Sequence, residues 1–134
     1  MHLGVFGGSF NPLHLGHIQI ALAALQEAGL SRMLLMVSGD PPHKDIAAGV
    51  SAQERLEMTK LAEEEYPSLV ASDLELRRPG KSYTVDTVEQ LKAENPGAEV
   101  YWLIGADMLL SLDTWYDPAR LMATTRFLVA GRPD

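Results

Sequence analysis

Two histidines, His14 and His17, lie three residues apart, shortly after an apolar run and the pair Gly7-Gly8. Residues at this spacing share a face if both lie in the first turn of a helix. An imidazole donates a hydrogen bond to a phosphoryl oxygen and adds positive charge when protonated. Glycines let the backbone approach a ligand, and a helix N-terminus attracts anions. The pattern predicts a phosphate site. The alternative is a structural glycine turn in which His14 caps the helix and His17 is half-buried.

Two further polar segments follow apolar runs. The loop SGDPPHK contains Lys44, which is either a cation for a phosphate or a solvated loop lysine. The segment GADML contains Gly105 and Asp107, and an acidic side chain here would accept hydrogen bonds from a ribose hydroxyl or cap a helix. A metal site built on the two histidines is not expected, because no third ligand lies nearby in the sequence.

The elements that would position these residues alternate along the chain. Helical spacing and a capping-box pattern, Ser51 with Glu54, predict helices, and short apolar runs predict buried strands. Strands separated by helices imply crossover connections and a mainly parallel sheet. We therefore predict one doubly wound α/β domain over residues 1–134, with ligands beyond the carboxyl ends of its strands. The expected strands are 2–6, 33–37, 69–76, 99–104 and 126–130, and the expected helices are 15–28, 52–65 and 84–94.

Composition narrows the function classes. The chain has 134 residues and a net charge of −7, which argues against binding to nucleic acid or to an anionic membrane surface. It has no cysteine, so disulfides are excluded. No apolar stretch is long enough to span a membrane, and the N-terminus lacks a signal-peptide pattern, so a cytoplasmic protein is expected.

The motif GGSFNPLHLGH, with the core His14-Leu15-Gly16-His17, resembles the [His/Thr]-x-Gly-His signature of the nucleotidyltransferase superfamily. Within it the chain is similar to the bacterial nicotinate mononucleotide adenylyltransferases, through PPHK, SYTVDT, GADML and the Trp-Tyr pair at 115–116. The segments occur in the family's order over essentially the whole chain. The resemblance implies a Rossmann-like nucleotidyltransferase fold. It also implies transfer of the adenylyl group of ATP to nicotinate mononucleotide, with release of pyrophosphate.

The resemblance also assigns roles to residues. Thr84 and its neighbours would bind the nicotinate carboxylate, and Trp115 would stack on the pyridine ring with Tyr116 beside it. The alternatives are that Thr84 caps a helix and that Trp115 packs in the core. Mg²⁺ would be held by the phosphates of ATP and by water, with no protein ligand. The implied catalytic residues are His14, His17 and Lys44. The implied ATP- and phosphate-binding residues are Gly7, Gly8, Ser9, Phe10, Gly105 and Asp107. The implied mononucleotide-binding residues are Tyr83, Thr84, Trp115 and Tyr116.

The chain departs from the family pattern after the segment VAGRP. Family members carry a motif of the form Ile-Ser-Ser-Thr-x-Ile-Arg beyond this point, and no such motif occurs before Asp134. We therefore expect a domain that is incomplete at its C-terminal end and an incomplete ATP half of the site. An exposed apolar sheet face would then favour self-association, so a homo-oligomer is one outcome. The alternative functions are another adenylyltransferase, such as pantetheine phosphate adenylyltransferase, and a nucleotide-binding fragment without turnover.

Overall fold

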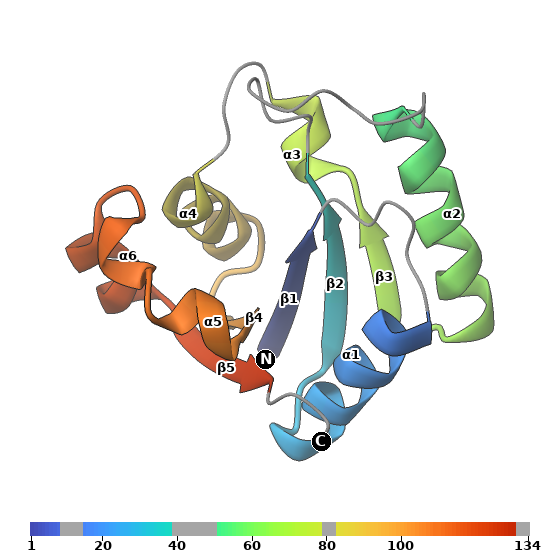
Figure 1. The fold of residues 1–134 in the computed structure, drawn as a ribbon, viewed down its shortest axis with the longest axis horizontal. Helices are drawn as coiled ribbons and strands as arrows, with labels where there is room; N and C mark the ends of the chain where they lie inside the picture. The colour runs from blue at the N-terminus through green and yellow to red at the C-terminus, as the bar shows by residue number, and fades with distance from the viewer. Residues whose placement is uncertain (9–14, 39–50, 79–82, 131–134) are drawn as a thin grey trace.

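The computed structural model describes residues 1–8, 15–38, 51–78 and 83–130. The described residues form five parallel strands in the order β3-β2-β1-β4-β5, with helices between them (Figure 1). The predicted doubly wound parallel α/β fold is confirmed. The strands are β1 (His2–Gly8), β2 (Arg32–Val37), β3 (Leu69–Ser72), β4 (Glu99–Gly105) and β5 (Arg126–Ala130). The helices are α1 (Leu15–Glu27), α2 (Ala52–Glu65), α3 (Leu74–Arg77), α4 (Thr84–Glu94), α5 (Ala106–Leu109), the 3₁₀ helix η2 (Leu112–Thr114) and α6 (Pro118–Thr124).

The strand order reverses at the centre of the sheet. From β1 the chain moves outward through β2 to β3, and it then returns to place β4 on the other side of β1. The register pairs Phe6 of β1 with Leu103 of β4, so the carboxyl ends of these two strands are neighbours. In open α/β sheets ligands bind at this switch point.

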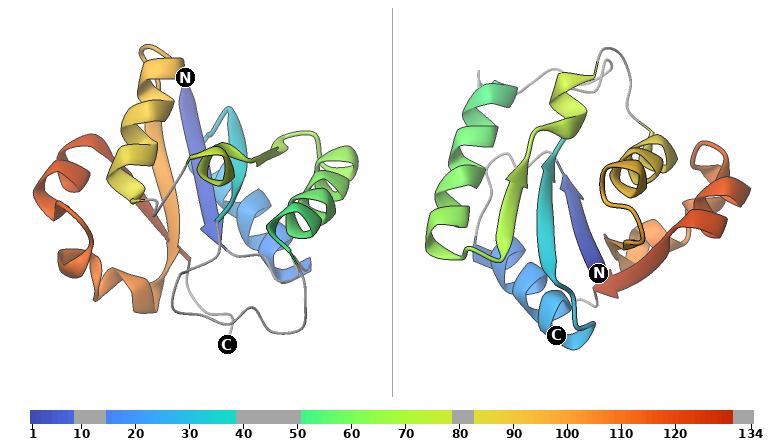
Figure 2. Two further views of the ribbon diagram at one scale, coloured as in Figure 1. Left: turned by 90° about the horizontal axis from the view of Figure 1, so that it is seen from above. Right: turned by 180° about the vertical axis from the view of Figure 1, so that it is seen from behind.

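Helices lie on both faces of the sheet (Figure 2), and buried side chains pack against each face. On one face, Leu74 of α3, Val88 of α4 and Leu112 of η2 pack against strand residues that include Trp102, which is 5% exposed. We call this the α4 face. The opposite face, the α1 face, is covered by α1 and α2. Its buried cluster contains Ala21, Leu30, Met33, Leu35, Val37, Leu56, Leu69 and Leu103.

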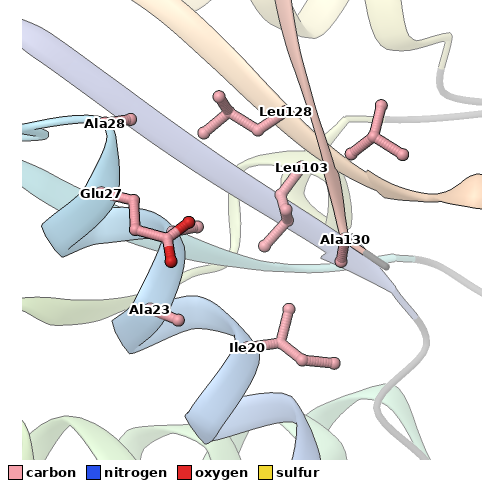
Figure 3. A pocket seen from close by; sticks show the side chains of 9 residues that line it. Ile20, Ala23, Glu27, Ala28, Leu103, Leu128 and Ala130 are labelled. Atoms are coloured by element: carbon pink, nitrogen blue, oxygen red, sulfur yellow. The ribbon is translucent and has the colours of Figure 1, made fainter. Parts of the chain in front are cut away.

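The cover of the α1 face is incomplete beside β5. A groove of about 400 Å³ lies between α1 and the strands β4 and β5 (Figure 3). Ile20 and Ala23 of α1 line one wall, and Leu103, Leu128 and Ala130 line the other. The groove is lined mainly by apolar side chains.

Local sequence patterns account for most element boundaries. The predicted capping box is confirmed, because the Glu54 backbone N–H donates to Ser51 Oγ at 3.1 Å. The predicted strand over 69–76 is wrong in its second half, where residues 74–77 form the short helix α3. The Leu74 N–H donates to Ser72 Oγ at 3.3 Å and the Arg77 N–H to the Asp73 carbonyl at 3.0 Å. These local bonds replace the strand ladder there.

The short elements α5, η2 and α6 were not predicted, because each is too brief to show a clear period. None of the helices in the described part of the chain is long and apolar enough to cross a membrane.

Candidate active site

The predicted turn at Gly7 and Gly8 is wrong, because both glycines belong to β1 and pair with Met36 and Val37 of β2. They lie at the end of β1 beside the switch point, and Gly7 has a packing reason to be glycine. A Cβ on Gly7 would lie 3.0 Å from Cζ2 of the buried Trp102 ring. A side chain at this position would therefore point into the packed α4 face rather than into open space. Gly8 is the last residue of β1. Ser9 and Phe10 lie outside the described residues.

His17 lies in the first turn of α1 and is half-buried. Its ring meets the Phe6 ring at a steep angle of 64°, with centroids 6.0 Å apart. Because Phe6 packs against the cluster of the α1 face, His17 approaches the end of β1 from that face. The predicted shared face with His14 stays a prediction, since His14 lies outside the described residues, as does Lys44.

The acceptor segments meet on the opposite face. Tyr83, immediately before α4, stacks on Tyr116, with centroids 4.3 Å apart and an interplanar angle of 27°. The structure thus brings Tyr83 of the SYTVDT motif next to Tyr116 of the Trp-Tyr pair. Thr84 is the first residue of α4, and the N-cap is Tyr83, whose side chain makes no capping hydrogen bond. The alternative that Thr84 is the helix cap is therefore wrong.

For Trp115 the structure supports the core-packing alternative, and stacking on a pyridine ring stays a prediction. It is partly buried and packs against the core cluster of the α4 face. Its ring lies nearly perpendicular to the Phe127 ring of β5, at 80° and 6.3 Å between centroids. Tyr116 is more open, at 52% exposed. The aromatic pair therefore has one ring anchored in the core and one ring toward solvent.

Gly105 ends β4 and is the N-cap of α5. Asp107 lies inside α5, so the alternative that it caps this helix is wrong. Because β1 and β4 are adjacent, the GADML segment follows the strand next to the one that ends in Gly7 and Gly8.

A buried polar cluster next to α4 was missed by the sequence analysis. The Thr87 hydroxyl donates to Glu75 Oε2 at 2.8 Å and accepts a hydrogen bond from the Arg78 guanidinium, which lies 3.9 Å from the same carboxylate oxygen. Burial raises the pKa of Glu75, and the Thr87 hydrogen bond and the Arg78 charge partly offset this rise. The spacing of Glu75 and Arg78 is visible in the sequence, but their partner on α4 is not.

Metal ligation by side chains has no candidate in the part of the chain that the structure describes. No group of three or more histidine, aspartate or glutamate side chains there could hold a metal ion.

The sheet order and the site at its switch point define a doubly wound α/β protein of the Rossmann-like class. A family model described as cytidylyltransferase-like matches residues 5–133, and the chain belongs to that family.

Sequence relatives carry a more specific name. The chain is 46% identical over 132 residues to a probable nicotinate-nucleotide adenylyltransferase of Synechococcus sp. (strain JA-3-3Ab), and the match covers 98% of this chain and 64% of the relative. A probable nicotinate-nucleotide adenylyltransferase of Trichlorobacter lovleyi is 42% identical, with 100% and 63% covered. The chain thus spans less than two thirds of the length of these relatives.

Solved structures share the fold at low sequence identity. A putative nicotinate-nucleotide adenylyltransferase from Vibrio parahaemolyticus superposes with a TM-score of 0.77 at 18% identity, covering 99% of this chain and 75% of that one. The Plasmodium falciparum nicotinic acid mononucleotide adenylyltransferase complexed with NaAD also gives a TM-score of 0.77, at 14% identity, with 99% and 76% covered.

Proposed function

We propose that the protein transfers the adenylyl group of ATP to nicotinate mononucleotide, giving nicotinate adenine dinucleotide and pyrophosphate. The observation that carries the proposal is the stack of Tyr83 on Tyr116, which joins the two acceptor segments beside the carboxyl edge of the sheet. The names of the sequence relatives support the same reaction.

The acceptor half is built on the α4 face. The first backbone N–H groups of a helix have no intrahelical partner and carry a partial positive charge. Because the Tyr83 side chain does not cap α4, these groups and the Thr84 hydroxyl can accommodate the nicotinate carboxylate. The pyridine ring then stacks on Trp115, with Tyr116 beside it.

The phosphate half is built on the end of β1 and the start of α1. The backbone from Gly7 to Phe10 cradles phosphates, and His14 and His17 donate to the transferred and leaving phosphoryl oxygens. Lys44 adds a mobile cation, and Gly105 and Asp107 contact ATP at the neighbouring strand end. The reaction needs no covalent intermediate, so the residues act by aligning two anionic groups and by neutralising charge on the departing pyrophosphate.

Magnesium enters this scheme with the substrate. Mg²⁺ keeps much of its hydration and is commonly bound through substrate phosphates, where it neutralises their charge. We therefore assign it no ligand among the protein side chains.

The deciding experiment measures pyrophosphate release with ATP and three acceptors: nicotinate mononucleotide, nicotinamide mononucleotide and phosphopantetheine. The 134-residue chain is compared with a form extended through the family's C-terminal motif. We expect pyrophosphate release with nicotinate mononucleotide and much less with the other two acceptors, because the proposed pocket is built for a carboxylate on the acceptor ring.

Each other outcome has a definite meaning. Turnover with phosphopantetheine would identify a different adenylyltransferase. Binding of ATP and acceptor without pyrophosphate release by either form would indicate a nucleotide-binding protein without turnover. Equal kcat for the short and extended forms would place the whole ATP site within residues 1–134.

A further inference from the structure

Arg120 of α6 lies among three carboxylates, two on α4 and one just before α6. Its Nη2 is 3.0 Å from Asp86 Oδ1, in a hydrogen bond. Its Nε is 3.3 Å from Glu89 Oε2 and 3.6 Å from Asp117 Oδ2. Asp86 and Glu89 belong to α4, and Asp117 precedes α6. One guanidinium therefore links α4 to the segment that leads into α6.

These carboxylates flank the stacked tyrosines in the sequence. Asp86 lies three residues after Tyr83, and Asp117 directly follows Tyr116. Asp117 has a φ of 49°, in the left-handed region that is rare for residues other than glycine. Its Oδ1 accepts the Arg120 backbone N–H at 3.4 Å, while its Oδ2 faces the guanidinium of the same residue. Arg120 thus contacts the turn that orients the Tyr116 ring.

The ion pairs of Arg120 with Asp86, Glu89 and Asp117 matter more for the relative position of α4 and the Tyr116 turn than for stability. The four side chains are 39–44% exposed, and ion pairs at such exposure contribute little to the free energy of unfolding. The buried Leu121, at 0% exposed, anchors α6 independently. Without Arg120, however, Asp86, Glu89 and Asp117 would lose the counter-charge that they share, and the modest repulsion among them would loosen the contact between α4 and the Tyr116 turn.

We propose that Arg120 is a positioning residue for the acceptor site: it holds the Tyr116 turn against the start of α4 and so keeps the two halves of that site together. The expected effect of Arg120 on the binding of nicotinate mononucleotide rests on the proposed function. Its expected effect on the Tyr83–Tyr116 stack does not depend on that function.

The first experiment reads the stack itself in the 134-residue chain. Tyrosine ring resonances are recorded by NMR, and a Tyr83→Leu variant reports the shift of Tyr116 without a stacked neighbour. In Arg120→Gln the Tyr116 ring resonances should shift toward the values measured in Tyr83→Leu. In Arg120→Lys, which keeps the positive charge, they should return part of the way toward the wild-type values. The matched control is Arg126→Gln, which should leave the Tyr116 resonances in place. Arg126, at the start of β5, also forms an exposed ion pair, with its Nε 3.3 Å from Glu99 Oε2.

The second experiment measures kinetics in the extended form. Arg120→Gln should raise KM for nicotinate mononucleotide about threefold to tenfold, as expected for neighbouring groups that couple. The KM for ATP and kcat should change by less than about twofold. Arg120→Gln/Glu89→Gln, which removes one of the repelling carboxylates, should recover part of the lost affinity.

The outcomes separate the two proposals. If Arg120→Gln leaves the Tyr116 resonances in place, or raises both KM values equally, the positioning role is wrong. If it displaces the ring but wild-type protein binds no nicotinate mononucleotide, Arg120 still positions the stack and the proposed function is wrong. A fall in kcat alone would also overturn the positioning role, since it would indicate contact with the reacting groups.

Discussion

The two faces of the sheet supply different halves of the proposed site and are held together differently. The α4 face carries the acceptor segments, and its side chains are fixed by a buried cluster, the Tyr83–Tyr116 stack and the polar groups around Arg120. The α1 face carries His17, and beside β5 it has an apolar groove about 400 Å³ in volume.

We infer from this difference that one face recognises the acceptor and the other binds phosphates. A face with specific ring and ion-pair contacts suits recognition of one acceptor, because its donors and rings must hold a fixed geometry. A face that presents an imidazole at the start of a helix suits phosphates, which several donors can hold by charge alone. Substitutions on the α4 face should then change acceptor affinity, and those on the α1 face should change the rate of the chemical step.

The largest effect is expected for His17. In the extended form, His17→Ala should lower kcat by about two to three orders of magnitude, because it removes a donor to developing phosphoryl charge. The measurement is steady-state turnover together with circular dichroism, to show that folding is intact. Gln19→Ala, at an exposed position of the same helix, is the control. A folded His17→Ala protein with near-normal kcat would remove the α1 face from the chemical step.

Thr84 tests the other face. Thr84→Val keeps the side-chain shape but removes the hydroxyl, so KM for nicotinate mononucleotide should rise about tenfold with kcat nearly unchanged, since hydrogen bonds to charged groups are typically worth about 1.5–3 kcal/mol. Thr84→Ser retains the hydroxyl and should resemble wild type. The wild-type preference for nicotinate over nicotinamide mononucleotide should shrink in the valine variant. Equal kcat/KM for the two mononucleotides in wild type would contradict this acceptor pocket.

Gly7 tests whether the absence of a side chain at the end of β1 is needed for packing as well as for the proposed phosphate site. Gly7→Ala should lower the free energy of unfolding by about 1 kcal/mol. Overpacking typically costs about 1–3 kcal/mol, and replacing a strand glycine returns about 0.5–1 kcal/mol. Urea unfolding measures the change. In a Trp102→Phe background the cost should shrink, because the ring atom nearest to the new Cβ is absent. An equal cost in both backgrounds would show that Trp102 is not the cause.

Glu75 gives the smallest effect, which depends on pH. Its pKa is raised from 4.5 in the folded protein, mainly by burial. The unfolded carboxyl therefore loses its proton at lower pH than the folded one. The Glu75 contribution to stability is fully present below pH 4.5 and decreases as pH rises through the folded pKa.

The measurement for Glu75 compares wild type with Glu75→Gln by urea unfolding between pH 5 and pH 7.5. The wild type should lose stability relative to the glutamine variant as pH rises, because glutamine does not titrate. A difference that stays constant over this range would show that burial does not shift the pKa of Glu75. The exposed Glu64→Gln variant is the control for a general effect of charge.

Local patterns predicted the long elements well, because a helix such as α2 carries its own capping box and a strand such as β2 is one apolar run. They failed over residues 74–77, where Leu74 suits a strand and a helix equally and where local hydrogen bonds to Ser72 and Asp73 favour the helix. The start of α4 at Thr84 was predictable, since helix-start signals depend on neighbouring residues. Gly7 and Gly8 were wrongly expected to form a turn, because their pairing with β2 does not show in the local sequence.

The sequence by itself determined the alternation of strands and helices, the parallel sheet and the family motif around His17, because each depends on spacing along the chain. Only the tertiary structure decided which side chains meet: Gly7 with Trp102, Tyr83 with Tyr116, Thr87 with Glu75, and Arg120 with Asp86. These partners are separated by 12 to 95 residues. Their contacts depend on the strand order and on how α3, α4 and α6 pack together, which no local pattern encodes.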